Sequence, residues 1–198
     1  MATPEKTGTK KTDMQSQAGD SKSGSAKEKS LKDLFEEGLK YMYSGETQIL
    51  EALPKVVQAV YSEDLQDALQ QHLQETKRHV ERLEKIFNRL GIDKSKAEKC
   101  KVMEAMIESN SKIIDEFEEG PIRDSALIIG TQKIEHHEIA SYGSLCELAD
   151  VLGHSQIADL LDRTLEEEER SDRTLSNIAC DVNDDAYEMS EDKVYQEA

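Results

Sequence analysis

The chain has 198 residues, 36% of them hydrophobic and 34% charged, which suffices for one ordinary domain with polar tails. Its formal net charge of −17 argues against nucleic acid or an anionic membrane surface as a partner, because both are bound mainly by clustered Lys and Arg. No segment is apolar enough to span a membrane, and the first residues lack the apolar core of a secretory signal. With three widely spaced cysteines and no CxxC pair, we expect reduced thiols in a cytoplasmic protein.

Both ends of the chain are polar. Residues 1–28 are rich in Lys, Ser, Thr and Gly and contain almost no large apolar side chain. Such a segment cannot bury enough surface to offset the entropy of ordering, so we expect a disordered polar tail. Residues 181–198 are strongly acidic and are expected to form a second, disordered tail. The folded domain is therefore expected to span residues 29–180.

Between the tails, apolar residues recur at helical spacing and nowhere alternate as a half-buried strand requires. The first helix is expected to start after an N-cap at Ser30 and to run to Pro54, which breaks or kinks it before a short continuation, KVVQAVY. The second helix is expected over about 63–90 and to end at Gly91.

A shorter amphipathic segment follows at about 97–118 and can cover one side of a bundle. Gly120 and Pro121 mark the start of another long helix, which should reach about Leu152, and Ser155 can cap the last helix. The sequence thus predicts an all-α fold, an antiparallel four-helix bundle with an additional shorter helix.

Each long helix carries ionisable residues at the middle of its inward-facing stripe. The acids are Glu46 on the first helix, Glu75 on the second, Glu135 and Glu138 on the third, and Glu168 and Asp172 on the fourth. Buried carboxylates gathered around one point repel one another unless a cation lies between them. The pattern therefore predicts two divalent metal ions bridged by carboxylates, although any one of these acids taken alone, in a chain with 42 Asp and Glu, is more often a solvent-exposed residue.

Several segments also resemble a known family. LFEEGLKYMYSGETQILEALPKVVQA, HLQETKRHVERLEKIF, QKIEHHEIASYGSL and the acidic fourth helix are similar to the YciF-like ferritin-like family of bacterial stress proteins, within the ferritin and rubrerythrin superfamily. The resemblance covers about residues 31–180. It implies a ferritin-like bundle, a homodimer, and a metal pair of iron, with manganese as the alternative. The implied ligands are Glu46, Glu75, Glu135, Glu138, Glu168 and Asp172.

The second helix departs from the superfamily pattern Glu-x-x-His, because Arg78 stands three residues after Glu75. His79 follows Glu75 on the same face and is counted with the candidate ligands. We expect His72 to contact the ligands from outside. For both histidines, a core imidazole paired with a carbonyl or carboxylate is an equal alternative.

Three further residues flank the two acids of the third long helix. We expect His136 and Tyr142 to form hydrogen bonds with the metal ligands, and His137 to face outward.

Two functions fit this pattern. In the first, the metal pair reduces peroxide or dioxygen, or oxidises Fe(II), with electrons from an external reductant, since the chain has no cysteine-ligated iron domain. In the second, the protein is a non-catalytic metal-binding or structural stress protein that acts through a partner.

Overall fold

The computed structural model describes residues 28–196. Its helices are α1 (Leu31–Ala59), α2 (Glu63–Leu90), the short 3-10 helix η1 (Lys94–Lys96), α3 (Lys101–Glu116), α4 (Pro121–Val151) and α5 (Ser155–Gln196). Within these residues there is no strand, so the predicted all-α fold is confirmed. The N-terminal tail expected over residues 1–28 lies outside the described residues except for its last position.

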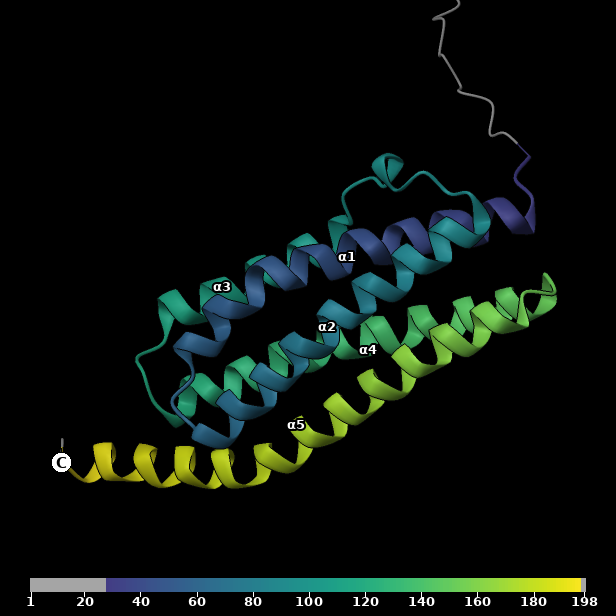
Figure 1. Ribbon diagram of the computed structural model, residues 1–198. Helices are drawn as coiled ribbons and strands as arrows, with labels where there is room; N and C mark the ends of the chain where they lie inside the picture. Colours follow the sequence, from purple (N-terminus) through teal and green to yellow (C-terminus); the bar gives the residue numbers. More distant parts are fainter. Residues whose placement is uncertain (1–27, 197–198) are drawn as a thin grey trace, which may run out of the picture.

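The four long helices form the bundle, and consecutive α-helices run in opposite directions (Figure 1). The shorter helix α3 packs against α1 and α4 and carries the chain back along the bundle, so α4 starts at the same end as α2. Both α1 and α5 contact α2 and α4. The inward stripes of the four long helices therefore face a common centre.

The ends of the first two helices follow local sequence signals. Ser30 accepts a hydrogen bond from the backbone N–H of Asp33, whose carboxylate accepts one from the Ser30 N–H, as in a capping box. Gly91 ends α2 with φ at 67°, a left-handed conformation that favours glycine. Both boundaries confirm the sequence predictions.

Pro54 does not end α1, which continues to Ala59. A proline within a helix removes one backbone hydrogen bond. The residues beyond it, Val56 and Val57, are nevertheless buried in the core, and this packing holds the last turns in helical form. Of the break or kink expected at Pro54, a break is therefore absent, and the expected short continuation is helical as far as Ala59.

The buried carboxylate of Asp124 joins the start of α4 to the turn between α1 and α2. It accepts hydrogen bonds from the backbone N–H groups of Tyr61, at 3.0 Å, and Ser62, at 2.7 Å. Ser62 in turn caps α2 through the N–H of Leu65. These bonds fix how α1, α2 and α4 are aligned lengthwise, so that their midpoints meet.

The apolar core consists of two clusters, one toward each end of the bundle. On α1 the first cluster includes Ile49 and Leu53, and the second includes Phe35 and Leu39. Glu46 lies between them. The same order holds on α2, α4 and α5, where the buried histidines and glutamates separate the two clusters. A layer of buried polar residues therefore crosses the middle of the bundle.

The helix α5 extends further than expected. We predicted an acidic, disordered tail over residues 181–198, but the helix continues to Gln196 and projects beyond the other helices (Figure 1). Val182 is still buried against the core. No Gly or Pro follows Gly153 in the sequence, so nothing in the chain stops a helix that packing has already nucleated.

No helix in the described part of the chain is both long and apolar enough to cross a membrane. The three cysteines all lie in this part, and each is a free thiol.

Candidate metal centre

Four glutamates in the polar layer are completely inaccessible to solvent. Glu46 comes from α1, Glu135 and Glu138 from α4, and Glu168 from α5, each with 0% exposure. The fourth helix, α2, contributes two buried histidines, His72 and His79. Each of the four long helices therefore supplies at least one metal-binding side chain to the same layer.

These six residues form two groups whose potential ligand atoms lie within 4.8 Å of one another. One group contains His72, Glu135, Glu138 and Glu168, and the other contains Glu46, His79 and Glu168. Glu168 belongs to both groups. A carboxylate has two oxygens, so Glu168 is placed to bridge two cations.

Most of the carboxylate oxygens in this layer have no hydrogen-bond partner in the protein. The unpaired buried atoms are Glu46 Oε2, Glu135 Oε2, and both side-chain oxygens of Glu138 and of Glu168. Leaving a buried charge unpaired is costly, and mixed carboxylate and imidazole donors suit first-row divalent metals. The residues present therefore fit a metal pair.

The acids of this layer affect one another's protonation. Burial raises the pKa of Glu135 and Glu138 well above its usual range, and repulsion from neighbouring carboxylates adds to the effect. Burial also acts to raise the pKa of Glu168, but His79, together with His72 and Glu135, outweighs burial and lowers the net pKa. The metal-free site is thus destabilised by its own charges, a penalty that a bound dication would remove.

The two histidines lie at opposite sides of Glu168. His79 Nδ1 is 2.9 Å from Glu168 Oε1 and 3.4 Å from Glu46 Oε1. His72 Nε2 is 3.5 Å from Glu135 Oε1, and its Nδ1 is 3.8 Å from Glu168 Oε2. We had expected His72 outside the ligand set, whereas the structure places it within one of the two groups.

Two hydroxyl groups orient the glutamates. Tyr142 donates a hydrogen bond of 2.5 Å to Glu46 Oε1, and Ser171 donates one of 3.0 Å to Glu135 Oε1. The Tyr142 contact matches the role that we predicted for it. Ser171 was missed, although its position three residues after Glu168, on the same face of α5, was a usable signal.

The structure does not bring Glu75 and Asp172 into the centre. Glu75 accepts a hydrogen bond from Gln71, and its carboxylate lies 3.5 Å from Arg78 and 3.9 Å from Arg170. It is buried but paired with cationic side chains at the edge of the α2 stripe.

Asp172 accepts a hydrogen bond from Gln132 at 3.0 Å and lies 3.2 Å from His136 Nε2. Four residues advance a helix slightly more than one turn, so Ser171 and Asp172 lie on either side of the line through Glu168. Ser171 takes the inward side and Asp172 faces α4.

The histidines of α4 also differ from expectation. His136 contacts Asp172 rather than a member of the two groups, and its side chain is 69% exposed. His137, expected to face outward, is half-buried with its ring against Tyr41, and burial lowers its pKa. Neither histidine lies in the centre.

Glu167 is another residue that sequence reasoning missed. It lies beside Glu168 on α5, where its carboxylate contacts His79 and Arg82. Burial acts to raise its pKa, but hydrogen bonds from Arg82 and His79 outweigh this effect and lower the pKa well below its usual range. An acid that looks surplus within the run EEEE is thus an ionised partner of the centre.

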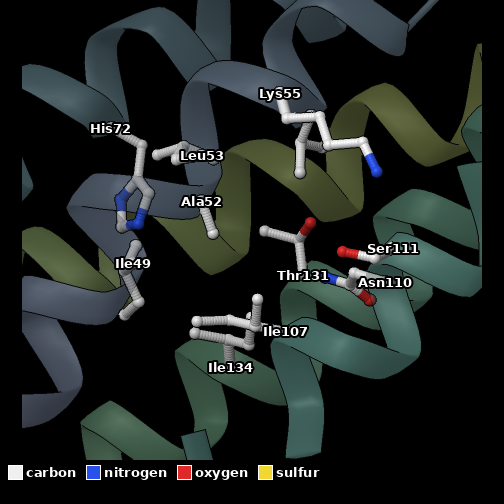
Figure 2. A pocket seen from close by; sticks show the side chains of 11 residues that line it. Ile49, Ala52, Leu53, Lys55, His72, Ile107, Asn110, Ser111, Thr131 and Ile134 are labelled. Carbon is white, nitrogen blue, oxygen red and sulfur yellow. The ribbon is translucent and has the colours of Figure 1, made fainter. Parts of the chain in front are cut away.

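A small cavity of about 30 Å³ borders the centre between α1, α3 and α4 (Figure 2). His72 closes one side, and Asn110 and Ser111 lie on the opposite side in Figure 2. Lys55, whose side chain is 58% exposed, also borders it. The walls between are mainly aliphatic, with Ile49, Ala52, Leu53, Val56, Ile107 and Ile134. The volume suits a molecule of about water size, since a water needs roughly 10–15 Å³.

A bundle of four long helices with glutamates and histidines buried at its centre defines a ferritin-like helical protein. The chain belongs to the family described as "Domain of unknown function (DUF892)", whose family model matches residues 30–187. It is 41% identical to Protein YciF of Escherichia coli (strain K12) over 151 residues, which are 76% of this chain and 91% of that protein.

Two solved structures share the fold. The crystal structure of the E. coli stress protein YciF matches with a TM-score of 0.76 and 39% identity, over 79% of this chain and 99% of that chain. The protein YcfI from Rhodopseudomonas palustris matches with a TM-score of 0.71 and 34% identity, over 75% of this chain and 94% of that chain. The bundle and the stress-protein family predicted from the sequence are therefore confirmed.

Proposed function

We propose that this protein binds two divalent metal ions, iron or alternatively manganese, and uses them to reduce peroxide or dioxygen or to oxidise Fe(II). The observation that carries this proposal is the set of unpaired, fully buried carboxylate oxygens on Glu46, Glu135, Glu138 and Glu168. Within an otherwise apolar core, these oxygens accept no aligned hydrogen bond, and His79 is too little cationic charge to compensate four buried carboxylates.

The two groups of side chains support the following assignment of ligands. Glu46 and His79 would hold one ion, His72, Glu135 and Glu138 would hold the other, and Glu168 would contact both. A bound iron pair would supply two electrons, one from each ion, which together with two protons suffice to reduce one peroxide to two waters. Tyr142 and Ser171 keep Glu46 and Glu135 oriented, and the apolar clusters on either side exclude bulk water.

The cavity beside His72 supports a small uncharged substrate. Its mainly aliphatic walls offer little to replace the water shell of a metal ion. Peroxide and dioxygen are neutral and small enough for such a space.

The remaining parts of the proposal come from the family and the composition. The E. coli protein YciF, 99% of whose chain is covered in the comparison of structures, is described as a stress protein, and we propose a stress role for this chain as well. The electrons that return the ions to the reduced state come from an external reductant. We further propose that the protein is a cytoplasmic homodimer.

The test uses protein stripped of metal by a chelator and then titrated with Fe²⁺ without oxygen. We expect uptake of about two ions per chain, followed by oxidation of the bound iron when hydrogen peroxide or dioxygen is added, with Mn²⁺ titrated in parallel. Failure to take up either metal would contradict the proposal. Uptake without consumption of peroxide or dioxygen would assign the protein to non-catalytic metal binding through a partner.

A further inference from the structure

The side chain of Arg82 on α2 donates two parallel hydrogen bonds to the carboxylate of Glu167 on α5. Arg82 Nη1 lies 2.6 Å from Glu167 Oε2, and Nη2 lies 2.8 Å from Oε1. The same Nη1 also donates to the hydroxyl of Thr164 at 3.0 Å. Both charged side chains are only 15% exposed. A two-point pair in this setting fixes the plane as well as the position of the carboxylate.

The fixed carboxylate contacts the imidazole of His79. Glu167 Oε2 lies 2.8 Å from His79 Nε2, whose side chain has no solvent exposure. A carboxylate paired with a guanidinium is ionised and can only accept hydrogen bonds. The ring nitrogen Nε2 must therefore carry the hydrogen and donate it to Glu167.

This bond determines which nitrogen of His79 faces the centre. Nδ1 has no aligned hydrogen-bond partner, although Glu168 Oε1 lies 2.9 Å away and Glu46 Oε1 3.4 Å away. In a neutral imidazole with its hydrogen on Nε2, the lone pair of Nδ1 points toward these two carboxylates. Such an arrangement is stable when a cation lies between the three groups.

We propose that Arg82 and Glu167 are positioning residues, which hold His79 in the Nε2–H tautomer and present Nδ1 to a metal ion shared with Glu46 and Glu168. The inference rests on the proposed metal binding and adds residues that contact no metal themselves. Arg82 fixes Glu167, Glu167 fixes His79, and His79 binds the ion.

The variant Glu167→Gln preserves the side-chain shape but removes the negative charge. Its amide has one acceptor oxygen instead of two, so it cannot accept all the hydrogen bonds that Arg82 and His79 donate to Glu167. We expect it to weaken Co²⁺ binding by about 10–100-fold, the range found when such supporting groups are removed. Glu169→Gln is the matched control, because Glu169 is on the same helix and pairs only loosely with Arg173 at 3.5 Å on the surface. It should bind Co²⁺ as the wild type does.

Glu167→Gln combined with His79→Ala shows whether Glu167 affects Co²⁺ affinity by orienting His79 or only through its negative charge. If Glu167 acts through His79, Glu167→Gln causes no further loss of Co²⁺ affinity once the imidazole is gone. An equal loss in both backgrounds would show that only the negative charge matters, and wild-type affinity in the single variant would also overturn the proposal.

A direct readout is nitrogen NMR of His79 in the Zn²⁺-loaded wild type, where we expect a slowly exchanging proton on Nε2. A proton on Nδ1 would contradict the inference even if metal binds. Absence of Co²⁺ and Zn²⁺ uptake by the wild type would instead contradict the proposed function and leave the positioning residues without a metal to serve.

Discussion

At the scale of single residues, the same side chain acquires opposite properties from its neighbours. Glu167 and Glu138 are both partly or fully buried glutamates near the centre. The first is paired with Arg82 and has a lowered pKa, whereas the second has two unpaired oxygens and a raised pKa. The difference is the presence or absence of a cationic partner, so Glu138 is the one that requires a metal ion.

Replacing Glu135 with Gln tests the charge of the centre. The variant keeps nearly the same shape and removes one negative charge, so we expect a large loss of iron affinity and of peroxide or dioxygen reactivity. The metal-free variant should be as stable as the wild type or more stable, because one source of carboxylate repulsion is gone. The measurements are metal titration and thermal unfolding, with the exposed Glu147→Gln on the same helix as control. A less stable metal-free variant that still binds iron normally would contradict the assignment.

The two acids that the structure leaves out of the centre should behave differently. Because Glu75 contacts Arg78 and Arg170, and Asp172 contacts Gln132 and His136, neither supplies an atom to the two groups. We expect Glu75→Gln and Asp172→Asn to bind two ions per chain with affinities within about threefold of wild type. Loss of one ion in either variant, measured by metal analysis, would restore that residue to the ligand set.

At the scale of helices, neighbouring residues of α5 make different contacts, because each leaves the helix in a different direction. Glu168 points inward, Glu167 reaches toward α2, and Ser171 supports a glutamate of α4. The helix α3, by contrast, supplies no residue to the two groups of candidate ligands. It covers α1 and α4 and forms one wall of the cavity beside His72.

Narrowing that cavity tests its proposed use. Figure 2 shows Ala52 of α1 directed into it, so Ala52→Met adds atoms that fill most of its volume of about 30 Å³. We expect oxidation of bound iron by peroxide or dioxygen to slow by about fivefold or more, with iron stoichiometry unchanged. The control is Ala105→Met, at an exposed position of α3. Equal rates in stopped-flow measurements of both variants would show that the substrate arrives elsewhere.

At the scale of the whole molecule, a polar layer divides the core, so the stability of the fold depends on what compensates its charges. In the metal-free protein the pKa values of Glu135 and Glu138 are raised above the usual 4.5. The folded state therefore binds more protons than the unfolded state above this value. Their contribution to stability is present at low pH and is lost as the pH rises through the raised values.

The raised pKa of His79 has the same effect on stability, which also falls as the pH rises. Burial alone lowers this pKa, but Glu46 and Glu168 outweigh burial and raise it well above 6.5. We therefore expect the melting temperature of the metal-free protein to fall as the pH rises above the ordinary pKa values of these groups, 4.5 for Glu135 and Glu138 and 6.5 for His79. Saturating metal should reverse much of this fall, because the ion replaces the protons, and Glu135→Gln should flatten it. A melting temperature that rises with pH in the metal-free protein would contradict this account.

Much of the fold was predictable from local signals. The capping box at Ser30, the glycine at position 91 and the period of the apolar stripes act within a few residues, so the sequence indicates them directly. The absence of a break in α1 at Pro54 and the length of α5 were not predictable in this way. Packing of Val56, Val57 and Val182 against distant helices stabilises these segments.

The sequence by itself determined that several acids fall at the midpoints of four helical stripes, because that pattern depends only on the helical repeat. Only the tertiary structure decided which of them meet. A helix position at the edge of a stripe can turn toward the centre or toward a neighbouring helix, and helix alignment selects between the two. That alignment directs Glu46, Glu135, Glu138 and Glu168 inward, together with both histidines of α2. Glu75 instead pairs with Arg78 and Arg170, and Asp172 accepts a hydrogen bond from Gln132 of α4. The resulting choice follows from contacts between residues far apart in the chain, which no local pattern encodes.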